Sequence, residues 1–146
     1  MDTINVSGNI SGAEENSRPL RILVVDDEAL IRWSLVETLS DSGHQTVEAA
    51  DGLTALRAVR DTSAPFDVVF LDFRLPDSSD LTLVSRLRQL APTTQVILLT
   101  AYGTPEVVQG ALDLGVFRVI GKPFEMADVP ALASQAHAAR RSGTAA

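Results

Sequence analysis

The 146-residue sequence predicts an α/β domain built on a five-stranded parallel sheet. Short apolar runs alternate with longer segments of helical spacing, which is typical of parallel strands joined by helices on both faces of a sheet. Four of the runs are almost continuously apolar, as expected of strands that are buried on both faces. These runs lie at 22–25, 68–71, 96–99 and 117–120, and polar residues follow each of them.

Strands and helices alternate along the chain. The strands are predicted at 21–25, 45–49, 68–71, 95–100 and 117–120. The helices are predicted at 28–42, 53–60, 81–90, 105–114 and 126–141. The second strand alternates polar and apolar residues, so we expect it at an edge of the sheet, where one of its faces meets water.

Apolar spacing and breaker residues place the helices. In the first helix Ile31, Leu35 and Leu39 recur at i, i+4 and i+8 on one face, and Gly43 is a suitable stop. The later helices are delimited by Asp51-Gly52, Ala91-Pro92, Pro105 and Gly115. Pro130 falls near the first turn of the last helix, so we expect this helix to start late or irregularly.

Composition limits the classes of function. The chain has no cysteine, which excludes disulfides, thiolate metal sites and a cysteine nucleophile. It has neither a ~20-residue apolar span nor the features of a signal peptide, so we expect a cytoplasmic protein. The net charge of −7 disfavours nonspecific binding to nucleic acid. We expect one domain at 20–141 between flexible tails at 1–19 and 142–146.

Polar side chains of three kinds are expected to meet at one end of the sheet. Ligands bind just beyond the carboxyl ends of parallel strands, and the apolar runs end there in Asp26-Asp27, Asp72, Thr100 and Lys122. Carboxylates suit a hard cation such as Mg²⁺. A hydroxyl and an ammonium can contact phosphoryl oxygens, and one carboxylate can act as a nucleophile that forms an aspartyl phosphate. The pattern therefore predicts cation-assisted phosphoryl transfer.

With these motifs the chain resembles the receiver domains of bacterial response regulators. The resemblance covers about 20–139 and rests on Ile-Leu-Val-Val-Asp-Asp-Glu, Leu-Asp-Phe-Arg-Leu-Pro-Asp, Leu-Leu-Thr-Ala-Tyr-Gly and Gly-Lys-Pro-Phe. It implies a flavodoxin-like fold with the strand order 2-1-3-4-5 and helices on both faces. Residues 26–35 are most similar to receivers of sigma-54 activator-type regulators.

The resemblance also implies roles for the acidic residues. Asp72 would be the phosphoacceptor, and the phosphoryl group would come from a histidine kinase or a histidine phosphotransfer protein. Asp27, Asp72 and the carbonyl of Arg74 would bind Mg²⁺, with Asp26 acting mainly through water. The protein would thus be a switch or phosphorelay intermediate that catalyses its own phosphorylation and dephosphorylation, and not an enzyme that acts on other substrates.

Two further residues of the expected site lie at the end of the fourth strand and just after the fifth. Thr100 and Lys122 would contact the phosphoryl oxygens, and the Lys122–Pro123 peptide bond would be cis. Two other positions depart from the family pattern. Val119 stands where receivers usually carry a switch aromatic, and Phe117 does not replace it, so another element must transmit activation. Asp80 stands where glycine is common, and Asp tolerates a positive φ better than most residues if the site needs one.

Three other functions fit parts of the pattern. An aspartate-nucleophile phosphatase usually has a second acid two residues after the nucleophile, where this chain has Arg74. A constitutive interaction domain would not need the complete set of acids with Thr100 and Lys122. The third alternative is that the chain is the receiver part of a longer DNA-binding regulator, which the genomic reading frame would decide.

Some residues outside the expected site have two interpretations. We expect Leu30 and Trp33 to be partly buried by helix packing, and the alternative is a docking surface for a kinase. His44 and His137 lack metal-ligand spacing, so solvated positions are expected. The alanine-rich segment 131–139 is a good helix former, and close helix packing in a homodimer is the alternative interpretation.

Overall fold

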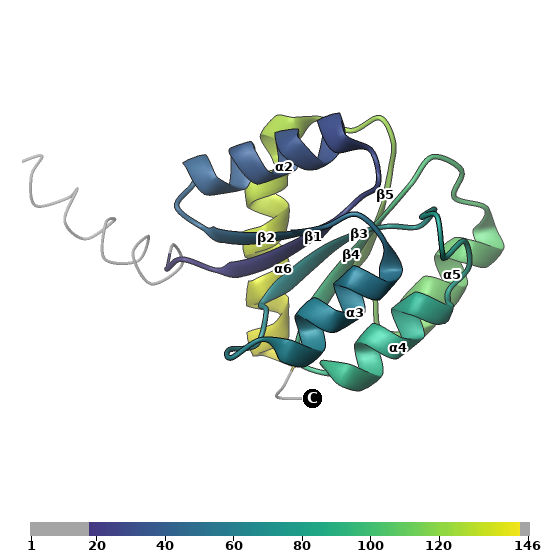
Figure 1. Ribbon diagram of the computed structural model, residues 1–146. Helices are drawn as coiled ribbons and strands as arrows, with labels where there is room; N and C mark the ends of the chain where they lie inside the picture. The colour runs from purple at the N-terminus through teal and green to yellow at the C-terminus, as the bar shows by residue number, and fades with distance from the viewer. Residues whose placement is uncertain (1–17, 144–146) are drawn as a thin grey trace, which may run out of the picture.

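The structure is a computed structural model that describes residues 18–143. At its centre is a parallel sheet with the strand order β2-β1-β3-β4-β5, as predicted (Figure 1). The strands are β1 (Arg21–Val25), β2 (Gln45–Ala49), β3 (Val68–Asp72), β4 (Gln95–Thr100) and β5 (Arg118–Gly121). The alternating strand β2 lies at an edge of the sheet. The predicted fold class is therefore confirmed.

Helices cover both faces of this sheet (Figure 1). One face is covered by α2 (Ala29–Asp41) and α6 (Val129–Gly143). The other face is covered by α3 (Gly52–Asp61), α4 (Thr82–Leu90) and α5 (Pro105–Asp113). Within residues 18–143, no helix is long and apolar enough to cross a membrane.

Some predicted boundaries need correction. β5 begins at Arg118, one residue later than predicted. The last helix begins at Val129, because Met126–Asp128 forms a separate 3-10 turn, η1. Pro130 is then its second residue, where a helix needs no backbone donor, so the expected late start is confirmed.

The ends of the domain also differ from the prediction. Helix α6 continues to Gly143, two residues into the predicted C-terminal tail. At the other end Arg18, placed in the predicted N-terminal tail, donates a hydrogen bond to Asp67 at 3.2 Å. The rest of the predicted tails, 1–17 and 144–146, lies outside the described residues.

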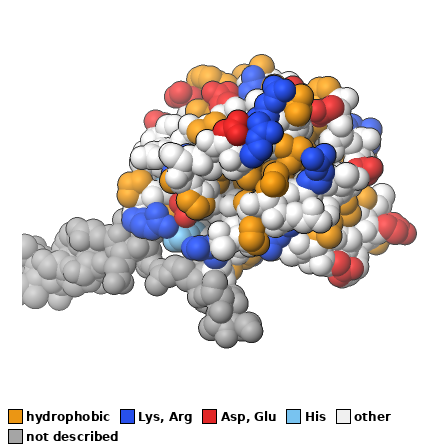
Figure 2. Space-filling view, turned by 60° about the horizontal axis from the view of Figure 1, so that its bottom comes forward, with side chains coloured by type: hydrophobic (Ala, Val, Ile, Leu, Met, Phe, Trp, Pro, Cys, Tyr) orange, Lys and Arg blue, Asp and Glu red, His pale blue; other side chains and the backbone are white. Residues whose placement is uncertain are grey.

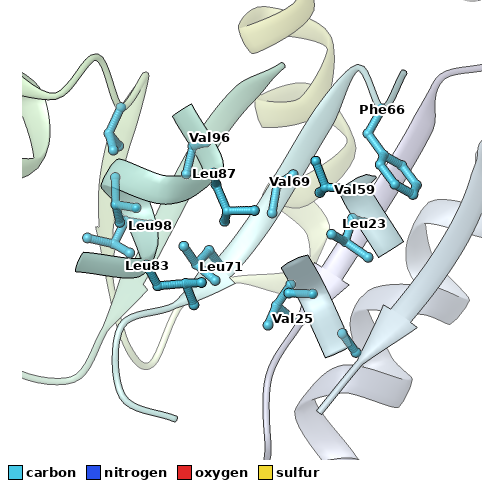
Figure 3. Close-up of a cluster of buried hydrophobic side chains, with 14 of the residues drawn as sticks. Leu23, Val25, Val59, Phe66, Val69, Leu71, Leu83, Leu87, Val96 and Leu98 are labelled. Carbon is cyan, nitrogen blue, oxygen red and sulfur yellow. The ribbon is translucent and has the colours of Figure 1, made fainter. Parts of the chain in front are cut away.

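Two apolar clusters fix the strands between the helices. The cluster under α3 and α4 is shown in Figure 3, where side chains of the sheet meet those of the two helices. Its strand residues include Leu23, Val25, Val69, Leu71, Val96 and Leu98, and its helix residues include Val59, Leu83 and Leu87. Full burial of each such side chain contributes about 1.5–3 kcal/mol. The sheet is thus a firm support for the polar groups at its carboxyl edge.

Helix α2 has one buried and one exposed face. Leu35 and Leu39 are fully buried against the second cluster, as their spacing predicts. Leu30 and Trp33, however, are 74% and 59% exposed. The expectation of partial burial is therefore wrong for both side chains, and the docking surface stays a prediction.

Both histidines lie near the amino ends of the strands, where the expectation of solvated positions is wrong. His44 is half-buried, and its Nδ1 accepts the backbone N–H of Leu20 at 3.0 Å. His137 lies 3.2 Å from the guanidinium of Arg18 and 3.9 Å from the carboxylate of Asp67. Figure 2, which turns the bottom of Figure 1 forward, shows a histidine among interspersed basic, acidic and hydrophobic side chains.

Candidate functional site

A cleft of about 330 Å³ lies at the carboxyl edge of the sheet. Four strands contribute to the site, because Asp26 follows β1, Asp72 ends β3, Thr100 ends β4 and Lys122 follows β5. The cleft is lined by Asp27, Glu28, Asp72, Arg74, Leu75, Pro76, Thr100, Ala101, Tyr102 and Lys122. The structure thus brings together the side chains that the sequence places at the strand ends.

Lys122 is the centre of the ionic contacts. Its Nζ lies 3.0 Å from Asp26 Oδ2, 3.1 Å from Glu28 Oε1 and 3.3 Å from Asp72 Oδ2. Burial disfavours the charged ammonium, but the hydrogen bonds to Asp26 and Glu28 outweigh this effect, so the pKa of Lys122 is raised. Lys122 therefore stays protonated opposite the carboxylates.

Sequence reasoning missed Glu28. This residue directly follows Asp26-Asp27, and an acid adjoining two others at a strand end was the available signal. Unlike Asp26, which is fully buried, the Glu28 side chain is 59% exposed. Its ion pair with Lys122 is consequently screened by water and weak by itself.

Asp26 is held from several sides. One oxygen accepts the backbone N–H of Glu28 at 2.9 Å, and the other accepts Lys122 Nζ. Its backbone carbonyl accepts Nη1 of Arg32 at 2.7 Å, and Arg32 pairs with Glu48 of β2 at 3.0 Å. Sequence reasoning also missed Arg32, which carries no signal because helices often bear an exposed arginine. Since Asp26 is fully buried and does not line the cleft, whereas Asp27 is exposed and lines it, Asp26 is less available than Asp27 as a direct ligand.

Asp72 combines burial with crowding. Its burial, followed by the nearby charge of Asp26, raises the pKa of Asp72 to about 6, although Lys122 and the backbone N–H of Arg74 act in the opposite direction. The Arg74 N–H donates to Asp72 Oδ1 at 3.2 Å. Near neutral pH the group is mostly ionised, as a nucleophile must be.

The three aspartates form a group that suits a hard cation. Asp26, Asp27 and Asp72 each offer a carboxylate oxygen, and these atoms lie within 4.8 Å of one another. Asp26 and Asp72 are buried, whereas Asp27 is exposed at the mouth of the cleft. With one ammonium facing them, these acids leave the site negatively charged. A dication that prefers oxygen ligands would relieve this repulsion.

The hydroxyl side of the cleft is formed by the end of β4. Thr100 is buried, and its Oγ1 accepts the backbone N–H of Tyr102 at 3.2 Å, so its own O–H can donate to a ligand. The Tyr102 side chain is 77% exposed. On the other side, the Lys122–Pro123 peptide bond is cis, as predicted.

The geometry agrees with a comparison against known families. Residues 22–134 match the family model of the response regulator receiver domain. The chain belongs to this family. Receivers are signalling modules that accept phosphoryl groups in two-component systems, and this chain is such a receiver.

Several known proteins are similar to this receiver. Sporulation initiation phosphotransferase F of Bacillus subtilis is 35% identical over 109 residues, which cover 75% of this chain and 86% of that protein. Regulatory protein AtoC of Escherichia coli is 34% identical over 80% of this chain, but the chain spans only 25% of AtoC. Similarity to AtoC and to the regulator NtrC agrees with the predicted likeness to sigma-54 activator-type receivers.

Solved structures show the same architecture. The CheY-like receiver domain protein from Methanospirillum hungatei has a TM-score of 0.80 and 25% identity, covering 86% of this chain and 99% of that one. The receiver domain of NtrX from Brucella abortus has a TM-score of 0.71 and 34% identity, covering 80% and 98% of the two chains.

Two family positions can be compared directly with the geometry. Val119 packs against the cluster under α3 and α4, whereas Phe117 packs on the opposite side of the sheet, with the Arg118 guanidinium 5.1 Å from its ring centroid. Phe117 is therefore not placed to replace a ring at Val119.

Asp80 does not need a left-handed backbone, because no non-glycine residue in the described range has a positive φ. Instead its carboxylate accepts the N–H of Thr82 at 2.9 Å.

Proposed function

We propose that this receiver takes a phosphoryl group onto Asp72 from the phosphohistidine of a histidine kinase or a histidine phosphotransfer protein. The observation that carries the proposal is the position of Asp72. It ends the fully buried strand β3 and faces the cleft with its carboxylate 3.3 Å from the ammonium of Lys122. Thr100 lines the same cleft from the neighbouring strand β4.

The transfer is a substitution at phosphorus. A carboxylate oxygen of Asp72 forms the new O–P bond while the N–P bond of the phosphohistidine breaks, and the imidazole nitrogen keeps the electron pair of that bond. The product is an acyl phosphate on Asp72. Hydrolysis by water then returns the carboxylate and releases inorganic phosphate.

The residues of the cleft have distinct tasks in this proposal. Asp27, Asp72 and the carbonyl of Arg74 would hold Mg²⁺, and Asp26 would act mainly through water, since it is fully buried and does not line the cleft. Bound Mg²⁺ supplies charge neutralisation at the phosphoryl oxygens.

The other charges of the transferred group would be met by protein side chains. Lys122 can exchange its contact with the Asp72 carboxylate for one with a phosphoryl oxygen, because that ammonium is already at the cleft. Thr100 can donate its hydroxyl to a second oxygen. Both interactions stabilise charge that is spread over the phosphoryl oxygens during transfer.

The test is a measurement of intact mass after incubation with acetyl phosphate, with and without Mg²⁺. We expect the wild type to gain one phosphoryl group only when Mg²⁺ is present and Asp72→Asn to gain none. Asp80→Asn is the matched control, because Asp80 is exposed and does not line the cleft. Equal uptake by the wild type and Asp72→Asn would refute the assignment. Transfer from purified histidine kinases of the source organism would then identify the donor.

A further inference from the structure

The loop after β3 contains a short closed turn. Leu75 and Ser78 exchange two backbone hydrogen bonds, with N···O distances of 2.7 and 3.2 Å. Pro76 and Asp77 lie between them at the tip of the turn. Leu75 is buried, whereas Asp77 is exposed. The backbone that follows the phosphoacceptor therefore has a defined shape.

This turn sets the direction of the Arg74 carbonyl. That carbonyl and the N–H of Leu75 belong to one planar trans peptide, so they point in opposite directions. The N–H is bound to the carbonyl of Ser78 at 2.7 Å. A displacement of Ser78 would consequently rotate the Arg74 carbonyl relative to the carboxylate of Asp72.

Asp77 attaches the turn to helix α3. Its two carboxylate oxygens accept the backbone N–H groups of Gly52 and Leu53 at 2.8 and 3.0 Å. These are the first N–H groups of α3, which have no partner within the helix. The helix dipole also favours a negative charge at this end. The tip of the turn is thus bound to the first residue of α3, Gly52, which precedes Asp77 by 25 residues in the chain.

The contact leaves little room for a side chain at Gly52. A Cβ atom there would lie 3.1 Å from Oδ1 of Asp77 and 3.2 Å from Cδ2 of Leu83. Both distances are tighter than nine in ten real contacts of a Cβ atom, so Asp77 or Leu83 would have to shift by a few tenths of an ångström. The turn and the start of α3 are therefore in close contact at Gly52.

We propose that Asp77 is a positioning residue for Mg²⁺ binding and, through it, for phosphorylation of Asp72. It contacts neither the metal nor the phosphoryl group. By holding the turn against α3, it fixes the orientation of the Arg74 carbonyl, which the proposed function assigns to Mg²⁺. The inference rests on the function proposed above, because it assumes that Asp72 is the phosphoacceptor.

Asp51 provides a matched control for this proposal. Its side chain caps the same helix by accepting the N–H of Thr54 at 2.7 Å, but it lies outside the loop that follows β3. Asp77→Ala and Asp51→Ala therefore both weaken the start of α3, and only Asp77→Ala releases the turn. Asp77→Asn keeps one oxygen as an acceptor and should be the milder change.

The experiment measures the dissociation constant of Mg²⁺ by calorimetry, the initial rate of phosphorylation by acetyl phosphate, and the unfolding temperature of each variant. For Asp77→Ala we expect Mg²⁺ affinity about 3- to 10-fold weaker and a phosphorylation rate lower by a similar factor at subsaturating Mg²⁺. Asp77→Asn should fall between this variant and the wild type. Asp51→Ala should lower the unfolding temperature while leaving Mg²⁺ affinity within about twofold of wild type.

Two results would overturn the inference. One is unchanged Mg²⁺ affinity in folded Asp77→Ala, or in Asp77→Asn if the alanine variant does not fold. The other is an equal loss of affinity in Asp51→Ala, because that would show a general effect of fraying α3. Failure of the proposed function looks different, since the wild type itself would then take up no phosphoryl group at Asp72.

Discussion

The carboxylate of Asp72 lies 3.3 Å from the ammonium of Lys122, yet the pKa of Asp72 is raised to about 6 from its ordinary value of 3.8. Burial of Asp72 and the neighbouring charge of Asp26 outweigh the attraction to Lys122. The ionised form needed for phosphoryl transfer is therefore the form that the fold without a cation disfavours.

Asp72→Asn should stabilise the protein in the absence of divalent cations. The folded state holds the Asp72 proton more tightly than the unfolded state does. The free-energy cost of ionising Asp72 in the folded protein is therefore absent below pH 3.8, grows between pH 3.8 and about 6, and is complete above pH 6. We expect a gain of about 1–3 kcal/mol in the free energy of unfolding at pH 7.5 and little change at pH 3.5. Denaturant unfolding with EDTA measures it. No gain at pH 7.5 would contradict the expectation, and Asp80→Asn, which removes an exposed charge, should give none.

His44 should make a second, opposite contribution to the pH dependence. Burial lowers the pKa of His44, partly offset by Asp67, and its Nδ1 accepts the N–H of Leu20. The associated stability is present above the unfolded value of 6.5 and is lost as pH falls below it. His44→Asn keeps an acceptor oxygen but does not titrate, so we expect this variant to lose less stability than wild type between pH 7 and 5. If the plots of stability against pH run parallel for the two proteins, the pKa of His44 does not differ between the folded and the unfolded state.

Trp33 should matter for transfer from the kinase and not for the chemistry. Its side chain is 59% exposed on α2 and does not line the cleft, so we expect its fluorescence to change little when Mg²⁺ binds. If Trp33 anchors the kinase, Trp33→Ala should raise the free-energy barrier to transfer from the cognate kinase by about 2 kcal/mol. Phosphorylation by acetyl phosphate should be unchanged. Leu90→Ala, at another exposed apolar side chain outside the cleft, is the control. Equal losses with both donors would indicate a folding role.

Loss of the phosphoryl group by hydrolysis should be slow. Arg74 and Tyr102 line the cleft, and neither offers a carboxylate or amide to hold a water for in-line attack. Arg74 can also donate hydrogen bonds to the phosphoryl oxygens and stabilise the acyl phosphate itself. We expect the Arg74→Asn, Tyr102→Glu double variant to lose phosphate at least about tenfold faster, which corresponds to about 1.4 kcal/mol in the barrier. The decay of intact mass measures it, and an unchanged rate would show that these side chains do not protect the bond.

The sheet and the cleft could be predicted because both follow from the order of residues along the chain. Apolar runs identify buried strands, and the residues just after them must meet at one edge of a parallel sheet. Asp77 could not be recognised in this way, because an aspartate in a turn has the same local pattern whether or not it caps a distant helix. His44 likewise follows a glycine in an apparent surface turn, and only the folded chain brings the Leu20 N–H to it. Such contacts depend on tertiary position and leave no local signal.

Strand β3 lies between β1 and β4, all five of its residues are buried, and its last residue is Asp72. Backbone amides in such a strand exchange with solvent mainly when the whole domain opens, so those of β3 should be among the slowest to exchange. The phosphoryl group would thus be attached to the least mobile part of the molecule. Structural responses to phosphorylation should consequently appear as changed exchange in the loops after β1, β3 and β4, with the amides of β3 as the internal reference.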